Sequence, residues 1–227
     1  MHRLIAVSLA SCASAFALAA AVPFIGPASA TTAASPSATS SAQAAAATTP
    51  NITPNITLDP VHSMAVFRVQ HLGAGFFWGR FNELGGTVTW PLDGSAAPVF
   101  DVTAQVNKVD TGSEKLDGNL QGPNFFNQAE FPTIAFKSAG ATKVGDNHWT
   151  VQGDLTLRGV TKTIAVDCHM VGVGKGPTGP KVGFECTFTI NRADYGMKWG
   201  IDAPKGALGN EVRMIIAMEG DAAKPQQ

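Results

Sequence analysis

The sequence predicts an all-β fold, a closed up-and-down antiparallel barrel with one short helix. Apolar and polar residues alternate through most of residues 56–220, and turn-forming residues divide this part of the chain into short segments. Alternation with a period of two residues is typical of strands that bury one face. Many short strands separated by turns, with a single helical interruption, favour a barrel over a parallel sheet with crossover helices.

The first 30 residues are predicted to be a secretory signal peptide. No Lys, Arg, Asp or Glu occurs between Arg3 and Asp59, and the run from Leu4 to Ile25 is apolar or small. Ala28-Ser29-Ala30 then supplies the small residues of a cleavage site, so we expect cleavage after Ala30. An uncleaved membrane anchor and a lipoprotein modified at Cys12 are the less favoured alternatives.

Residues 31–55 are rich in Ala, Thr, Ser and Pro, which predicts a flexible linker. The barrel is predicted to span residues 56–221, and a disordered tail to span 222–227. All 17 acidic residues and all 16 basic residues except Arg3 lie from Asp59 onward. The low charge of the chain, 15% against about 25% in average domains, therefore reflects mainly the export signal and the linker.

The alternating segments are clearest at residues 100–107, 149–157 and 212–218. In each of them the apolar side chains share one parity, so we expect one face of the strand to be buried. Turns are predicted at Asp93-Gly94, 145–147, Arg158-Gly159 and 174–180. Residues 113–121 break the alternation and predict the helix, with Ser113 as its N-cap.

The segments on either side of the turn at 174–180 predict a hairpin with a defined register. Pairing Cys168 with Cys186 places Met170 opposite Phe184, Val166 opposite Phe188 and Ile164 opposite Ile190, so every inward pair is apolar. A slip of one residue would turn one strand inside out. Opposed cysteines in an oxidising compartment predict a disulfide between Cys168 and Cys186, with two buried free thiols as the alternative.

The charge and the motifs exclude several classes of protein. A net charge of −1 lacks the basic character of a nucleic-acid binder. The chain has no HExxH, GxSxG or P-loop motif, and no histidine at metal-ligand spacing, so we predict neither a catalytic residue nor a metal site. His71 shares the parity of Phe67 and Val69, which favours a buried histidine or one that contacts a ligand.

Several motifs resemble the YceI-like family of periplasmic proteins. They lie at Val69–Gly73, Gly79–Phe81, Leu84–Gly86, Val109–Thr111, Asn124–Phe126, Phe131–Phe136, Gly153–Lys162 and Phe184–Gly196. The resemblance implies an extended lipocalin-like barrel whose tunnel binds a polyisoprenoid chain, such as an isoprenoid quinone or a polyprenyl lipid. It implies a periplasmic location, no catalytic residues and no required cofactor. The Cys168/Cys186 pair is a departure from the family pattern.

Residues with inward parity are the predicted ligand-binding residues, because the inner face of a roomy barrel can contact a ligand instead of itself. They are Phe67, Val69, His71, Val88, Trp90, Phe100, Val102, Phe136, Trp149, Val166, Phe184, Phe188, Met214 and Ile216. A plain packed core is the competing interpretation of the same pattern. The aromatic residues in segments flanked by glycine or asparagine are predicted to shape the tunnel mouth, and they are Phe76, Phe77, Trp78, Phe125 and Phe126.

The hypothesis favoured by the sequence is a non-catalytic periplasmic carrier of an isoprenoid lipid. One alternative is a barrel enzyme acting on an apolar substrate, with Asp154, Asp167 and His169 as its nearest candidates. Another is a stress-response module that binds a membrane protein, which an exposed apolar patch would support. Transient contacts with inner-membrane proteins and a homodimer are both compatible with the pattern.

Overall fold

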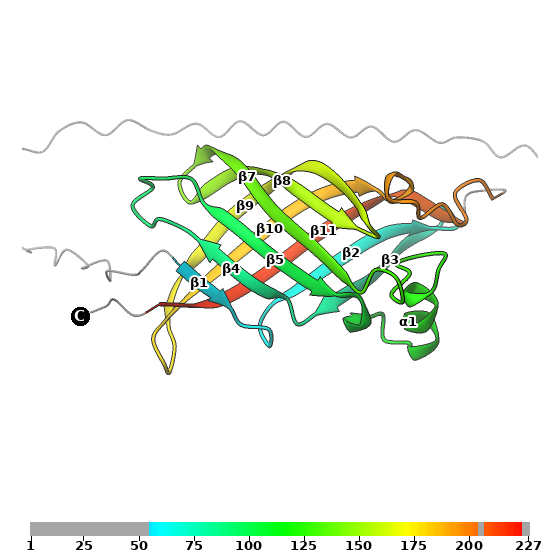
Figure 1. The fold of residues 1–227 in the computed structure, drawn as a ribbon, viewed down its shortest axis with the longest axis horizontal. Helices are drawn as coiled ribbons and strands as arrows, with labels where there is room; N and C mark the ends of the chain where they lie inside the picture. Colours follow the sequence, from blue (N-terminus) through cyan, green and yellow to red (C-terminus); the bar gives the residue numbers. More distant parts are fainter. Residues whose placement is uncertain (1–54, 204–206, 224–227) are drawn as a thin grey trace, which may run out of the picture. The chain divides into compact units, whose positions relative to one another are not determined.

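The computed structural model describes residues 55–203 and 207–223, which form one antiparallel sheet closed into a barrel (Figure 1). The predicted signal peptide, the predicted linker up to residue 54, and residues 224–227 of the predicted tail lie outside the described residues. The strands are β1 (Asn55–Leu58), β2 (Met64–His71), β3 (Gly75–Asn82), β4 (Gly85–Thr89), β5 (Val99–Gln105), β6 (Val109–Asp110), β7 (Thr133–Gly145), β8 (His148–Leu157), β9 (Val160–Lys175), β10 (Pro180–Asn191) and β11 (Leu208–Ala222). The predicted all-β barrel is confirmed.

Pairing of β1 with β11 closes the ring β1-β4-β5-β7-β8-β9-β10-β11. From β7 to β11, consecutive strands are neighbours, as in an up-and-down barrel. The hairpin β2–β3 departs from that order, because β2 pairs with β11 from Leu208 to Ala217 while β1 pairs with β11 from Gly220 to Ala222. β3 and β6 continue the sheet beyond β2, so the barrel wall is extended at the end where α1 lies (Figure 1).

The single predicted helix is confirmed as α1 (Glu114–Gln121), with Ser113 at the N-cap position. The hydroxyl of Ser113 makes no capping bond, and its carbonyl accepts from the amides of Leu116 and Asp117. The Asp117 carboxylate accepts from the amide and hydroxyl of Thr111, which ties the helix to the end of β6. Two short 3₁₀ turns, η1 (Val106–Lys108) and η2 (Arg192–Tyr195), complete the described helical structure. Among the described residues, no helix has the length and apolarity needed to cross a bilayer.

The predicted register of the β9–β10 hairpin is confirmed around the cysteines. Cys168 lies opposite Cys186 and Met170 opposite Phe184. The pairing of these two strands ends at Asp167 and Thr187, so the predicted pairs Val166–Phe188 and Ile164–Ile190 do not form. Beyond that point β9 pairs only with β8, and β10 pairs only with β11.

The structure differs from the predicted disulfide, because Cys168 and Cys186 are buried free thiols. A hydrogen bond with the Cys168 thiol and burial raise the pKa of Cys186 well above its ordinary value. Disulfide formation requires a thiolate. The Cys186 sulfur, held protonated in an apolar interior, therefore has little tendency to react with the opposed Cys168.

Candidate functional site

The barrel encloses an apolar cavity of about 160 Å³. Its wall is built by β2, β3, β5 and the strands from β7 to β11, with α1 and the segment after it at one end. The polar members of the wall among the described residues are Thr103, Arg192 and the two thiols. The apolar members are Ala65, Phe67, Val69, Phe81, Leu84, Phe100, Val102, Ala104, Leu120, Phe125, Phe126, Ile134, Phe136, Leu155, Leu157, Val166, Phe188, Ile190, Met197, Leu208, Val212, Met214, Ile216 and Met218.

Most of the predicted ligand-binding residues lie in this wall. They are Phe67, Val69, Phe100, Val102, Phe136, Val166, Phe188, Met214 and Ile216, together with Phe125 and Phe126 from the predicted mouth. Sequence reasoning missed several wall residues, although their parity was informative. On β8, Leu155 and Leu157 lie on the same inward face as Trp149. On β3, Phe81 lies on the same inward face as Gly79.

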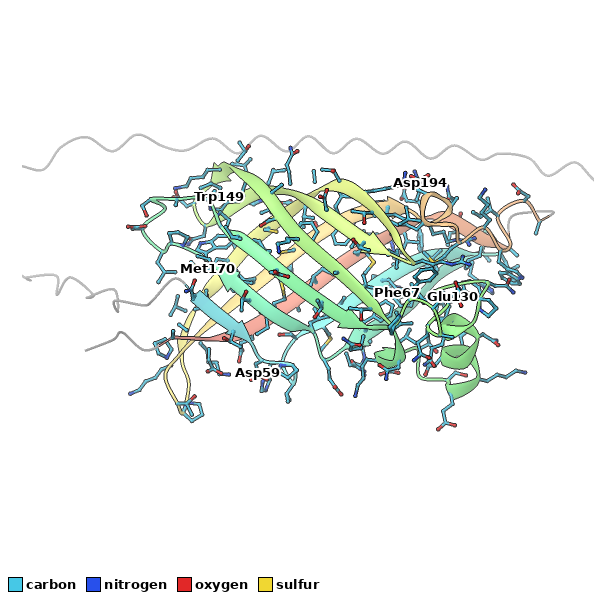
Figure 2. All side chains as sticks on the ribbon, in the orientation of Figure 1. Asp59, Phe67, Glu130, Trp149, Met170 and Asp194 are labelled. Atoms are coloured by element: carbon cyan, nitrogen blue, oxygen red, sulfur yellow. The ribbon has the colours of Figure 1, made fainter. Side chains whose placement is uncertain are left out.

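Four predicted ligand-binding residues lie outside the cavity, in a packed core that we call the aromatic plug: Val88, Trp90, Trp149 and Phe184. The ring centroids of Trp90 and Phe184 are 5.3 Å apart, and each ring also packs against Phe100 at 6.2 Å. In Figure 2, Trp149 lies toward one end of the barrel and Phe67 toward the other. The plug therefore fills one end of the barrel, and the cavity occupies the rest.

The prediction that His71 faces the interior is wrong. His71 is the last residue of β2 and is exposed, because the alternation of buried and less buried residues along β2 ends at Val69, and both Gln70 and His71 face solvent. Phe76 and Trp78 of the predicted mouth are also exposed and lie outside the cavity wall, on the outer face of the hairpin. Phe77 is half-buried and packs against the main core.

The loop between β10 and β11 is held at the cavity wall by Arg192, whose side chain is only 3% exposed. Its guanidinium donates to four backbone carbonyls at 2.7–2.8 Å, those of Met197, Trp199, Leu208 and Gly209. Burial lowers the pKa of Arg192. A planar, forked guanidinium group suits a cluster of several carbonyl acceptors, since it places several N–H donors in one plane.

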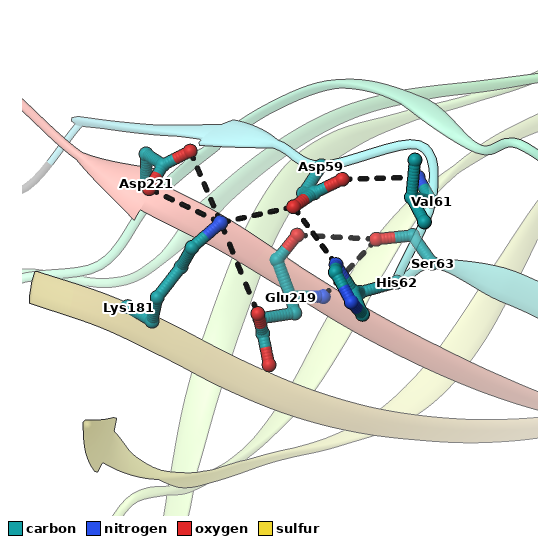
Figure 3. Close-up of polar contacts among 7 residues, drawn as sticks. All are labelled: Asp59, Val61, His62, Ser63, Lys181, Glu219 and Asp221. Atoms are coloured by element: carbon teal, nitrogen blue, oxygen red, sulfur yellow. Dashed lines mark hydrogen bonds and ion pairs between the residues drawn. The ribbon is translucent and has the colours of Figure 1, made fainter. Parts of the chain in front are cut away.

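A polar cluster joins the β1–β2 loop to β10 and β11, and sequence reasoning missed it (Figure 3). Asp59, His62 and Glu219 place potential metal-ligand atoms within 4.8 Å of one another. The ammonium group of Lys181 lies among them, 2.9 Å from Asp59, 3.1 Å from Asp221 and 3.9 Å from Glu219. Because a cation of the chain itself already faces these carboxylates, the cluster acts as a structural clasp. Only the three-residue spacing of Asp59 and His62 was visible in the sequence.

The electrostatics of this clasp are dominated by Asp59. Hydrogen bonds from His62, Lys181 and the amide of Val61 hold the pKa of Asp59 well below its ordinary value. Lys181 shows the reciprocal effect, because its hydrogen bond to Asp59 raises its pKa. Both groups are thus charged at neutral pH.

The candidates of the enzymatic alternative lie on the outer face of the barrel. Asp154 accepts a hydrogen bond from Thr163 at 2.7 Å, and Asp167 pairs with His148. His169 is exposed, with its ring centroid 5.9 Å from that of His148. The cavity wall in the described residues contains no carboxylate or histidine.

A family model for the YceI-like domain matches residues 56–220, which span nearly the whole barrel. The chain belongs to the YceI-like family. The protein YceI of Escherichia coli is 36% identical to it over 160 residues, which cover 70% of this chain and 81% of that protein.

Solved structures show the same YceI-like fold. BcnA of Burkholderia cenocepacia superimposes with a TM-score of 0.65 at 19% identity, over 72% of this chain and 99% of that one. A polyisoprenoid binding domain from Saccharophagus degradans superimposes with a TM-score of 0.55 at 16% identity, over 76% of this chain and 99% of that one. At these identities the superpositions establish the architecture alone.

Proposed function

We propose that this YceI-like protein is an exported, non-catalytic carrier that holds the chain of an isoprenoid lipid in its barrel. The observation that supports the proposal is the cavity of about 160 Å³ with an almost entirely apolar wall. The polyisoprenoid-binding domain of Saccharophagus degradans shares the architecture that encloses it. An isoprenoid quinone and a polyprenyl lipid both carry the branched apolar chain that such a wall recognises.

Binding would be driven by removing the isoprenoid chain from water, at about 25 cal/mol per Å² of apolar area. Arg192 is the charged group of the described wall, and backbone carbonyls already occupy its donors. Recognition therefore depends on the chain rather than on an anionic head group. Met197, Met214 and Met218 line the cavity, and their unbranched side chains can adapt to a ligand of irregular outline.

The test is extraction and native mass spectrometry of the protein purified from its own host, followed by titration with an isoprenoid quinone. We expect a bound isoprenoid of defined mass. Val166→Phe places a ring into the cavity and should weaken binding at least tenfold, because Val166 is part of its wall.

Val171→Phe is the matched control, since Val171 is exposed on the same strand and should bind like the wild type. Circular dichroism and thermal unfolding of both variants establish that they are folded. An empty wild-type protein that also fails to take up quinone, or full binding by Val166→Phe, would contradict the proposal.

Export to the periplasm is part of the proposal and is supported by the N-terminal sequence. We expect fractionation of the host to recover the protein with the periplasm, and the mature N-terminus to be Thr31. A protein that retains residues 1–30 would favour the uncleaved anchor, and a lipid-modified N-terminal Cys12 would favour the lipoprotein.

A further inference from the structure

Exposed apolar residues gather on the outer surface beside one end of the cavity. Leu72 is 58% exposed, Phe76 55%, Trp78 49% and Trp199 52%. With Arg68 and Arg213 they form what we call the rim patch. The proposed function does not use these side chains, and exposed apolar groups at this density mark an interaction surface.

Sheet register places three members of the rim patch in one row. Arg213 of β11 lies opposite Arg68 of β2, and Arg68 lies opposite Trp78 of β3. The guanidinium of Arg68 stands 4.0 Å from the ring centroid of Phe76 and 5.7 Å from that of Trp78. These cation–π contacts hold the two aromatic rings on the outer face, beside a pair of arginines.

Backbone contacts connect the hairpin part of the rim patch to Trp199. The amide of Leu72 donates to the carbonyl of Ala207 at 3.1 Å, and the amide of Leu208 donates to the carbonyl of Gly200 at 3.3 Å. The loop that carries Trp199 is thus fixed beside the β2–β3 hairpin. Figure 1 shows this loop and the hairpin at the same end of the barrel as α1.

Trp199 also connects the rim patch to the cavity. Its ring centroid lies 5.6 Å from that of Phe125, which follows α1 and forms part of the cavity wall. A chain leaving the cavity past Phe125 would therefore meet Trp199 on the outer surface. The surface that holds the exposed aromatic residues adjoins the end of the cavity away from the aromatic plug.

The arginines of the rim patch carry charge that other described residues do not neutralise. Arg80, two positions along β3 from Trp78, pairs with Asp110 at 2.7 Å. In contrast, Arg68 and Arg213 form no ion pair with any described residue, Glu211 included. Two unpaired arginines among exposed tryptophans suit a surface that offers anionic groups above an apolar layer.

We propose that the rim patch docks on the surface of a bilayer that contains anionic phospholipids. Tryptophan rings favour the interface between head groups and acyl chains, and basic side chains are attracted to anionic head groups. Exposed aromatic rings and a pair of basic side chains each bind a membrane weakly, and together they attach the protein to it reversibly. The purpose of docking, transfer of the chain past Trp199 and Phe125, rests on the proposed function. The docking itself is measurable without any cargo.

The experiment is flotation of the full mature chain with vesicles of phosphatidylcholine alone or of phosphatidylcholine and phosphatidylglycerol. We expect the wild type to float with the mixed vesicles, to lose binding as salt rises, and to float poorly with phosphatidylcholine. Arg213→Gln should reduce the partition coefficient for the mixed vesicles about fivefold, the contribution of one basic residue at an anionic surface. Phe76→Ser combined with Trp78→Ser should reduce it at least as much.

The matched control is Val99→Ser combined with Val144→Ser, which removes two valines of similar exposure outside the rim patch. This double variant should float like the wild type. Insertion should also shift the fluorescence of the exposed Trp78 and Trp199 to shorter wavelength, while Trp90 and Trp149 are buried. Wild-type flotation by the Phe76/Trp78 variant would overturn the proposal.

Two further measurements separate this proposal from the proposed function and from other occupants of the patch. Quinone binding in detergent should be equal in the wild type and in both rim variants. If quinone binding fails while flotation persists, the proposed cargo is wrong and the docking proposal stands. If light scattering instead shows a dimer that the Phe76/Trp78 variant dissociates, and the wild type does not float, the patch is a subunit interface and the docking proposal is overturned.

Discussion

At the residue scale, the two thiols of the barrel lie directly opposite one another and yet are protected from reaction. Cys168 and Cys186 are buried, lie opposite one another and form part of the cavity wall. The raised pKa of Cys186 depletes the thiolate that would attack an oxidant or an alkylating reagent. The surrounding strands also limit the access of reagents. The small thiolate population of Cys186 and the limited access therefore both slow the reaction.

We therefore predict that both thiols of the folded protein resist iodoacetamide at neutral pH. After unfolding in the absence of reductant, both should react, giving two adducts by intact-protein mass spectrometry. A mass two hydrogens lower with no adducts would show that a disulfide forms in the protein isolated from its host. Added quinone should slow the native reaction further if the cavity is the binding site.

Gly79 provides a second test at the residue scale, because it makes room for a cavity residue. A Cβ at Gly79 would lie 2.3 Å from Cζ of Phe67, its partner across the β2–β3 pair. Gly79→Ala should therefore displace the Phe67 ring, cost about 1–3 kcal/mol of unfolding free energy and weaken quinone binding. Gly75→Ala on the same strand is the control, since nothing lies within 4 Å of its Cβ position. Equal stability of the two variants in urea unfolding would refute this account of Phe67.

At the scale of elements, Arg192 fastens the loop between β10 and β11 to the cavity wall. Arg192→Met removes the donors from four carbonyls and should cost roughly 2–4 kcal/mol in urea unfolding. Arg192→Lys keeps the charge but loses the planar fork, and should recover only part of the loss. Hydrogen exchange should rise at the amides of residues 197–203 in both variants. Unchanged protection there would mean that other contacts hold the loop.

The short strand β6 depends on an ion pair, and its contribution should depend on pH. Asp110 accepts from Arg80 at 2.7 Å, from the amide of Gly112 at 2.9 Å and from Asn82 at 3.2 Å, which lowers the pKa of Asp110 to about 2. A depressed carboxylate pKa adds stability above the unfolded value of 3.8, and that stability disappears as the pH falls to about 2.

Asp110→Asn should therefore be less stable than the wild type at pH 6, and the two proteins should converge between pH 4 and 2. Thermal unfolding across this range measures the difference. The other groups that raise acid sensitivity, chiefly Asp59, remain in both proteins and cancel in the comparison. A stability difference that is constant down to pH 2 would exclude titration of Asp110 as its source.

The part of the structure that could be predicted from the sequence also differs from element to element. The helix α1 and the register around Cys168 and Cys186 could be predicted, because both depend on residues close together in the chain. The separation of β9 from β10 beyond Thr187 could not, because β10 continues with β11, a strand that follows a long loop. His71 was misplaced for a similar reason, since parity alone does not show where the buried face of a strand ends.

At the scale of the whole molecule, the same inward pattern builds both the aromatic plug and the cavity. Trp90 and Phe184 pack against one another, whereas Phe67 and Phe188 face free space. Alternation along a strand predicts which side chains face inward. The space between opposite walls depends on how eight strands close, which no local pattern records. The inner face could thus be predicted from the sequence, and its division into plug and cavity could not.

This division predicts how affinity depends on ligand length. Because the plug fills one end of the barrel, the chain has a limited length of cavity to occupy. For isoprenoid alcohols of increasing length, each added unit should improve affinity by tenfold or more while it is buried, at about 0.8 kcal/mol per methylene. The gain should stop once the cavity is full, and Val166→Phe should stop it at a shorter chain. Calorimetric titration in detergent measures the series. Affinity that rises without a plateau would mean that the plug yields to the ligand, and affinity that never depends on length would place the chain outside the barrel.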